Sequence, residues 1–184
     1  MENDPEPVRV FRERAFYEGP ELWLGQRDVE LPDRERIWWD VVRLYRSASV
    51  VLVDDSKARV LLVRRHRFLQ QRWGWELPGG LVDKDERPRE AAMRELEDQA
   101  GHRVEDLEKL LSFEPEPRSV VGEHTIFIGR GAQRIDGDDP LTWDIGRVEW
   151  VPLESVPGLI SSGEVWASAT LIGLLRFLAL ERQT

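Results

Sequence analysis

The chain has 184 residues, of which 41% are hydrophobic, enough to bury one sizeable core but too few to suggest two ordinary domains. Its formal net charge of -9 at pH 7 leaves no basic surplus, which argues against binding to a nucleic acid polymer. The chain contains no cysteine, which excludes disulfides and a thiol nucleophile and agrees with a reducing compartment.

Neither end of the sequence has the pattern of an export or membrane segment. Residues 1–5 are acidic and lack the basic and apolar regions of a signal peptide. The apolar stretch at residues 171–180 is interrupted by Arg176 and is too short to cross a bilayer. We therefore expect a cytoplasmic protein with no membrane partner, in which this stretch is a packed terminal helix.

Residues 1–40 differ from the rest because charged residues, Pro and Gly are interleaved with aromatic side chains. This segment has too little helix-forming or strand-forming sequence to bury Trp23, Trp38 and Trp39 alone, so we predict that it packs on a second copy. The expected organisation is an N-terminal dimerisation arm at residues 1–40, followed by one domain at residues 41–184.

The sequence of residues 41–184 predicts strands and two helices. Residues 165–180 have helical periodicity and are expected to close the domain. Strands with one internal and one terminal helix indicate an α+β fold, an α/β/α sandwich with a mixed sheet. A hairpin turn is expected at residues 54–57, between the second and third of the predicted strands. Alternating and β-branched runs place these strands at residues 41–44, 49–53, 60–63, 110–113, 125–128 and 148–151.

The internal helix is predicted at residues 88–100, where Pro88 suits the first helical position. Glu95, Asp98 and Gln99 are three and four positions apart and project from one helical face. Clustered oxygen ligands of this kind are what Mg²⁺ accepts, so a metal-assisted phosphate site is one interpretation. A solvated acidic helix face is the other, because charge runs are often only surface.

The order of residues between positions 80 and 102 favours the first interpretation, because it resembles the box of the Nudix family. That box is a Gly, five residues, a Glu, seven residues, Arg-Glu, an aliphatic, any residue, Glu-Glu, any residue, Gly and an aliphatic. The resemblance also includes residues 61–67 and 75–80 and covers roughly residue 41 to the end. The box positions that match in register are Gly80, Glu86, Arg94, Glu95, Leu96 and Gly101.

Three positions depart from the box: Asp98 and Gln99 replace the Glu-Glu pair, and His102 replaces the aliphatic. The residue that matches Gln99 is a direct metal ligand in ADP-ribose pyrophosphatases, and an amide oxygen is a weaker ligand than a carboxylate. Natural degeneration toward a binding role is one explanation. An engineered Glu-to-Gln change is the other, and it is favoured because the remaining box residues are present.

Within the Nudix family, the chain resembles ADP-ribose pyrophosphatases in its N-terminal arm, in the proline-containing residues 114–117, and in residues 121–128 and 150–153. In that group the arm exchanges strands between two subunits and helps to sandwich the adenine. The resemblance therefore implies a homodimer that binds a small nucleotide. It makes base-stacking candidates of Phe11, Phe16 and Trp39, although ordinary packing is the alternative for each one.

The resemblance also implies residues for the diphosphate. Arg67 matches an arginine that touches it, and a planar guanidinium can hold two phosphate oxygens; a surface ion pair is the alternative. Arg46 is a further substrate-binding candidate. Glu86 and Arg94 are expected to pair with each other and brace the loop against the helix. His66 and His124 are interpreted as structural.

The mechanism implied by the resemblance uses Mg²⁺ or Mn²⁺ held by the Gly79 carbonyl, Glu95, Asp98 and Gln99. The metal would help a water to attack one phosphorus of ADP-ribose or a related nucleoside diphosphate sugar, giving a nucleoside monophosphate and a sugar phosphate. The general base is expected among the acidic side chains of residues 135–144, with Asp144 carried as the catalytic candidate. The others are Asp136, Asp138 and Asp139.

Two further interpretations stay open. A Nudix hydrolase for another nucleotide, such as UDP-glucose or an oxidised nucleoside triphosphate, would share the box and differ in the base pocket. A non-catalytic nucleotide sensor would share the pocket and lack turnover.

Overall fold

A computed structural model of the chain describes residues 7–137 and 142–182. Contacts between residues divide the chain into two compact units. The N-terminal unit consists of Met1–Tyr45 and Glu114–Glu123, and the larger unit consists of Arg46–Phe113 and His124–Thr184. Each unit has its own sheet structure. Among the described residues, no helix combines the length and apolar character needed to span a membrane.

The larger unit is built on a four-stranded mixed sheet. Its central strands, β4 (Ser47–Leu52) and β11 (His124–Gly129), are parallel. Its outer strands, β7 (Gly79–Leu81) and β9 (Leu107–Phe113), run antiparallel to their neighbours and complete the order β7-β4-β11-β9. The predicted strands at 49–53, 110–113 and 125–128 all lie in this sheet.

A second sheet has three antiparallel strands in the order β13-β5-β6, namely β5 (Arg59–Arg67), β6 (Arg72–Glu76) and β13 (Ile145–Pro152). The predicted turn at residues 54–57 is formed, and the Lys57 N–H donates to the Asp54 carbonyl at 2.9 Å. Only an isolated bridge between Val53 and Val60 joins the two strands that flank it, so they enter different sheets. Two short strands, β8 (His102–Arg103) and β12 (Gln133–Arg134), form a separate pair.

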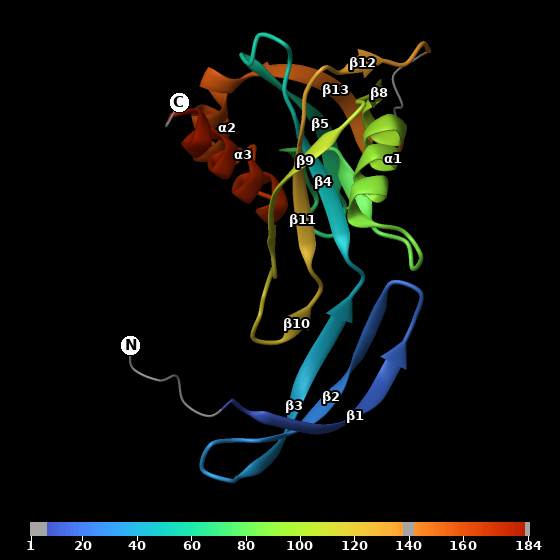
Figure 1. The fold of residues 1–184 in the computed structure, drawn as a ribbon, viewed down its shortest axis with the longest axis vertical. Helices are drawn as coiled ribbons and strands as arrows, with labels where there is room; N and C mark the ends of the chain where they lie inside the picture. The colour runs from blue at the N-terminus through green and yellow to red at the C-terminus, as the bar shows by residue number, and fades with distance from the viewer. Residues whose placement is uncertain (1–6, 138–141, 183–184) are drawn as a thin grey trace. The chain divides into compact units, whose positions relative to one another are not determined.

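Helices cover both sides of these strands (Figure 1): α1 (Pro88–Ala100) lies on one side, and α2 (Val156–Ser161) and α3 (Ser168–Glu181) on the other. Successive side chains of a strand point to opposite faces, so Val50 of β4 packs with α1 while Val51 packs with α3. Both faces of β4 are therefore buried. The predicted α/β/α sandwich with a mixed sheet is confirmed, while α2 and the short 3-10 helix η1 (Leu153–Ser155) before it were not predicted.

The sequence of α1 explains its two ends. Pro88 occupies the first turn, where a missing N–H costs nothing, and the Arg87 N–H donates to the Glu90 carboxylate at 3.1 Å. Gly101 ends the helix with φ of 60°, a left-handed conformation that favours glycine. On the inner face, Ala91, Ala92, Leu96 and Ala100 are buried. The helix predicted at residues 88–100 is confirmed.

The N-terminal unit is a four-stranded sheet in the order β1-β2-β3-β10. Its three long strands, β1 (Arg9–Glu18), β2 (Leu22–Glu30) and β3 (Arg36–Leu44), are antiparallel, and β10 (Val120–Val121) runs parallel to β3. The expectation of too little strand-forming sequence in residues 1–40 is wrong. All ten residues of β1 are exposed, so the strand lacks the alternation between apolar and polar residues on which the prediction relied.

A buried carboxylate helps to hold this sheet. Asp28 of β2 is 4% exposed and accepts hydrogen bonds from Arg36 of β3 and Arg12 of β1, each at 3.1 Å. The bond from Arg36 lowers the pKa of Asp28, so the carboxylate stays charged and links three neighbouring strands. Trp23 is buried in this unit, whereas Trp38 and Trp39 are half-buried.

Candidate active site

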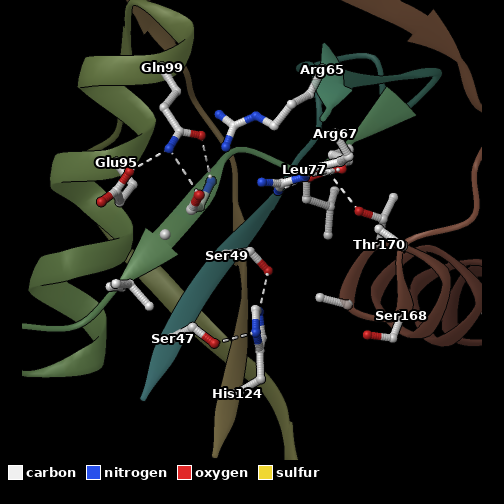
Figure 2. Close-up of a pocket in the computed structure, with 16 residues that line it drawn as sticks. Ser47, Ser49, Arg65, Arg67, Leu77, Glu95, Gln99, His124, Ser168 and Thr170 are labelled. Carbon is white, nitrogen blue, oxygen red and sulfur yellow. Dashed lines mark hydrogen bonds and ion pairs between the residues drawn. The ribbon is translucent and has the colours of Figure 1, made fainter. Parts of the chain in front are cut away.

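The larger unit contains a cavity of about 570 Å³ (Figure 2) that is open to solvent. One wall comes from α1 and β7, a second from β5 and β6, and the floor from β4 and β11. The start of α3 contributes the remaining side chains. The charged and hydrogen-bonding residues that line it are Ser47, Ser49, Arg65, Arg67, Glu76, Glu95, Gln99, His124, Ser168 and Thr170.

Glu95 and Gln99 reach the cavity from successive turns of α1. Both are partly buried, and Gly79 and Gly80 of β7 face them. A side chain at position 80 would meet the Glu95 carboxylate and require it to shift, so glycine leaves room for Glu95 in its observed position. The spacing of Gly80 and Glu95 in the sequence thus has a steric reason.

The Gln99 amide makes three hydrogen bonds across this wall. Its Nε2 donates to the Gly79 carbonyl at 2.9 Å and to the Glu95 Oε2 at 2.5 Å. Its Oε1 accepts from the Gly79 N–H at 3.1 Å. The opposite amide orientation would set the amide oxygen against two acceptors and the amide nitrogen against a donor, so the network determines the orientation.

The other Glu95 oxygen is held by Arg94. The Arg94 Nη1 donates to Glu95 Oε1 at 2.6 Å, and the same guanidinium donates to both oxygens of Glu86 and to the Leu81 carbonyl. The bond to Glu86 raises the pKa of Arg94, which keeps the arginine charged, and lowers that of Glu86. Glu86 and Arg94 therefore brace the loop against α1, as the sequence predicted.

On the opposite wall, Arg67 of β5 is oriented by Glu76 of β6. Arg67 Nε donates to Glu76 Oε1 at 2.9 Å and its Nη2 donates to Oε2 at 2.5 Å. These bonds raise the pKa of Arg67. A guanidinium has five N–H donors, so this pair leaves three for another partner. Arg67 therefore has the ion pair of the alternative interpretation and also lines the cavity.

Arg65, two residues earlier on the same face of β5, is the most buried cation of this wall. It is 8% exposed, and burial lowers the pKa of its guanidinium. Its Nε lies 3.6 Å from Asp144 Oδ2, an ion-pair distance longer than a hydrogen bond. Within residues 7–137 and 142–182, this Nε finds no hydrogen-bond partner. Figure 2 shows the Arg65 side chain extending toward Gln99.

The floor holds a neutral histidine between two hydroxyls. His124 Nδ1 lies 2.6 Å from the Ser47 Oγ, and its Nε2 lies 3.0 Å from the Ser49 Oγ. Burial lowers the pKa of His124 to about 4, so the ring is neutral at pH 7 and one nitrogen donates while the other accepts. The ring also stacks on Phe113, with 5.3 Å between centroids.

Comparison with known families identifies this arrangement. The sequence model of the NUDIX domain matches residues 43–170, well over half of the chain. The chain belongs to the NUDIX domain family. The matched range contains every residue that lines the cavity.

Individual relatives agree with this assignment. The chain is 38% identical to a CMP-5'-(N-acetyl-N-hydroxy-3-aminopropyl)phosphonate hydrolase of Streptomyces rubellomurinus, covering 91% of this chain and 81% of the relative. It is 26% identical to an ADP-ribose pyrophosphatase of Bacillus subtilis, covering 88% of each. A crystal structure of an ADP compounds hydrolase has the same fold, with a TM-score of 0.80, 17% identity and coverage of 98% of this chain and 97% of that one. The chain is therefore a Nudix hydrolase that resembles ADP-ribose pyrophosphatases.

Nudix hydrolases generally use a divalent metal such as Mg²⁺, so the groups implied as its ligands can be tested for fit. Gln99 directs its amide nitrogen, a donor, at both the Gly79 carbonyl and the Glu95 carboxylate. Asp98 is exposed and does not line the cavity. Among the described residues, no group of three or more His, Asp or Glu side chains is placed to hold a metal. As folded, these four groups do not fit a cation. The metal ligands implied by the resemblance stay a prediction, and the contacts of Gln99 argue against it.

Other predicted residues are not among those that line the cavity. Arg46 is exposed and its Nη2 donates to the Glu86 carbonyl at 3.3 Å. Phe16 and Trp39 belong to the N-terminal unit, where the Trp39 Nε1 donates to the Arg118 carbonyl at 3.0 Å and Phe16 is 58% exposed. His102, which replaces the aliphatic of the box, is buried with its ring edge-on to Trp150. The substrate-binding roles of Arg46, Phe16 and Trp39 stay predictions.

Of the candidates for the general base, Asp144 lies beside Arg65 and accepts a hydrogen bond from the Thr142 hydroxyl at 2.5 Å. Asp136 is exposed. Asp138 and Asp139 lie outside the described residues. The choice of Asp144 as the base stays a prediction.

Sequence reasoning missed three parts of the cavity. Arg65 could have been found, because it shares the face of β5 with Arg67 at a spacing of two. The partnership of Arg67 with Glu76 depends on the register between β5 and β6. The hydroxyls that flank His124 depend on the parallel pairing of β4 with β11, which no local pattern reveals.

Proposed function

We propose that the chain hydrolyses the phosphoanhydride bond of ADP-ribose or a related nucleoside diphosphate sugar, releasing a nucleoside monophosphate and a sugar phosphate. The observation that carries this proposal is the pair of arginines, Arg65 and Arg67, facing the Nudix box residues Glu95 and Gln99 across one cavity. A diphosphate is a dianion, and the N–H groups of two guanidiniums can hold its oxygens.

Each wall has a part in the proposed reaction. Glu76 holds Arg67 in position, and the free edge of the guanidinium binds one phosphoryl oxygen. Arg65 neutralises the second phosphate group. A water oxygen attaches to one phosphorus while the bridging oxygen leaves with the other, and the water proton passes to a base for which Asp144 is the candidate.

The relatives named above narrow the class of substrate. The names of the Bacillus and Streptomyces proteins indicate a nucleoside 5'-monophosphate joined to a second phosphorus acid, a sugar phosphate in one and a phosphonate in the other. We propose that this shared linkage, rather than a particular base, is what the cavity recognises. The sugar or phosphonate would extend toward Ser168 and Thr170 at the start of α3.

A substrate panel tests the proposal. Purified protein is incubated with ADP-ribose, UDP-glucose, a CMP-linked phosphonate and 8-oxo-dGTP, and the products are separated by anion-exchange chromatography. We expect ADP-ribose or the CMP-linked phosphonate to yield a nucleoside monophosphate. Cleavage of 8-oxo-dGTP alone would move the chain to the nucleoside triphosphate class.

A second candidate, a nucleotide-binding protein without turnover, is favoured by the contacts of Gln99, whose amide donates to two groups implied as metal ligands. Calorimetry separates the two candidates. Binding of ADP-ribose with no product after prolonged incubation supports the second, and product formation supports the first.

We also propose that the N-terminal unit mediates a homodimer. It presents an apolar groove of about 500 Å³ whose walls include Val8, Val10, Val29 and Trp39. Exposed apolar surface of this kind marks an interface in many proteins. Sedimentation at micromolar concentration should give the mass of a dimer, and Val10→Lys should reduce it to that of a monomer. Arg14→Lys in the same strand serves as the control, and a monomeric mass for the unaltered chain would contradict the proposal.

A further inference from the structure

We propose that this cavity holds a diphosphate without a divalent cation, with the Gln99 amide in the cation's place and Arg65 supplying the fixed positive charge. The inference rests on the proposed function in one respect, that a diphosphate enters this cavity. It goes beyond that function in stating that no divalent cation takes part in neutralising the charge of the diphosphate.

The Gln99 amide nitrogen lies within hydrogen-bond distance of oxygens from two groups that the family resemblance implies as metal ligands. It is 2.9 Å from the Gly79 carbonyl oxygen and 2.5 Å from Glu95 Oε2. A carboxylate at position 99 has no hydrogen to donate, so it would repel both oxygens unless a cation stood between the three groups. Glutamine links them directly. The wall is therefore complete without metal.

The donors and acceptors of this wall are also matched to each other. Gly79 uses both its N–H and its carbonyl with Gln99, and Glu95 uses one oxygen with Gln99 and the other with Arg94. A cation that entered would have to displace the amide from two acceptors. The displaced amide would then lose partners in a partly buried position, which costs free energy.

Arg65 supplies what this wall lacks, a positive charge that no carboxylate among the described residues holds by a short hydrogen bond, since its ion-pair partner Asp144 lies 3.6 Å away. Arg94 and Arg67 are each hydrogen-bonded to glutamates, so their charges are already balanced. Arg65 is 8% exposed, its nearest carboxylate oxygen is 3.6 Å away, and its Nε finds no hydrogen-bond partner among the described residues. A buried cation is costly unless an anion pairs with it. Asp144 meets that need in part, and a diphosphate oxygen in the cavity that the Arg65 guanidinium lines would add a closer anion.

The first experiment measures metal binding alone and needs no nucleotide. Mn²⁺ is titrated into the protein and free Mn²⁺ is followed by electron paramagnetic resonance. We expect Gln99→Glu to bind Mn²⁺ at least ~10-fold more tightly than the unaltered chain, because it adds a carboxylate and removes the amide donor. Gln133→Glu makes the same charge change on an exposed strand away from the cavity and should leave the affinity unchanged. Equal affinities for the unaltered chain and Gln99→Glu would overturn the inference.

The second experiment measures anion binding, with inorganic pyrophosphate as the probe in calorimetry. The unaltered chain should bind it equally well in EDTA and in excess Mg²⁺, whereas Gln99→Glu should bind it only with Mg²⁺. A loss of pyrophosphate binding by the unaltered chain in EDTA would overturn the inference. The part of this comparison that is made on the unaltered chain alone needs no variant and is therefore independent of any folding defect.

Arg65 is then tested in EDTA. Arg65→Gln should weaken pyrophosphate binding at least ~10-fold, the scale of a charge-assisted hydrogen bond, while the exposed Arg176→Gln on α3 should leave it unchanged. Arg65→Lys keeps the charge and should recover part of the affinity. Circular dichroism checks that each variant is folded. Unchanged affinity in folded Arg65→Gln would overturn the role of Arg65.

The same data separate this inference from the proposed function. Pyrophosphate binding in EDTA without any binding or cleavage of the nucleotide panel supports the inference and contradicts the proposed substrate class. Nucleotide cleavage that depends on Mg²⁺ in the unaltered chain, together with tight Mn²⁺ binding, supports the proposed function and overturns the inference.

Discussion

The polar groups of the two cavity walls differ in their hydrogen bonding. On the α1 side, Gln99, Glu95 and Gly79 satisfy one another, and Arg94 closes the network from behind. On the β5 side, Arg67 is satisfied by Glu76 while Arg65 keeps an Nε without a hydrogen-bond partner among the described residues. The polar groups of the first wall therefore bond to one another, whereas we propose that Arg65 in the second wall binds an anion. Affinity and turnover are therefore expected to respond to different residues.

The largest effect is expected on the rate of hydrolysis, when Gln99 of the α1 wall is changed. Gln99→Glu should raise hydrolysis of ADP-ribose in Mg²⁺ at least ~100-fold, or about 2.7 kcal/mol of transition-state stabilisation, because a carboxylate replaces the amide that ties up Gly79 and Glu95. Initial rates of AMP release measure this, with Gln133→Glu as the control. If both proteins turn over equally fast, position 99 is not where turnover is limited.

The arginine wall should control affinity instead. Arg67→Ala should weaken nucleotide binding by roughly 1.5 to 3 kcal/mol, the scale of hydrogen bonds to a charged group. It should also lower stability, because Glu76 is 6% exposed and would lose its partner.

The double variant Arg67→Ala/Glu76→Gln separates these two effects. It should recover stability in thermal melts without recovering affinity in calorimetry. Affinity that remains unchanged in Arg67→Ala would return this residue to a purely structural ion pair.

The floor between the walls should respond to pH. The folded pKa of His124 is about 4, below its ordinary value of 6.5, so the unfolded chain binds this proton first as pH falls. The stabilisation is therefore full above pH 6.5 and is lost progressively as pH falls toward 4. At pH 5 the loss is roughly 2 kcal/mol, from about 1.4 kcal/mol per pH unit.

Urea unfolding between pH 5 and 7.5 tests this dependence against His124→Asn, which lacks the titrating ring. The difference between the two stability curves should shrink on acidification. Parallel curves would show that His124 is protonated equally in the folded and unfolded chain.

The smallest effect is expected behind the α1 wall. Glu86→Gln should destabilise the chain by about 0.5 to 1 kcal/mol, because it weakens a partly exposed ion pair with Arg94 and leaves the packing of α1 intact. Thermal unfolding measures the loss. Glu116→Gln, in the N-terminal unit, makes the same change and should have less effect. A loss of several kcal/mol would mean that Glu86 supports Glu95 and the cavity itself.

Local sequence patterns predict much of the fold of the larger unit. The apolar spacing of Ala91, Ala92 and Leu96 and the flanking Pro88 and Gly101 predict α1, because helical periodicity and end signals act within a few residues. Runs of β-branched residues likewise predict the buried strands. The strands β1 and β2 were not predicted, since all of β1 is exposed and the buried positions of β2 do not alternate regularly.

The sequence by itself determined the family pattern, the helix that carries Glu95 and Gln99, and the brace between Glu86 and Arg94, because these depend on spacing along the chain. Only the tertiary structure decided what the side chains do. It placed the Gly79 backbone against Gln99, buried Arg65 beyond hydrogen-bond distance of Asp144, and set His124 between Ser47 and Ser49. Each of these contacts joins segments brought together by sheet register and layer packing, which no short stretch of sequence specifies.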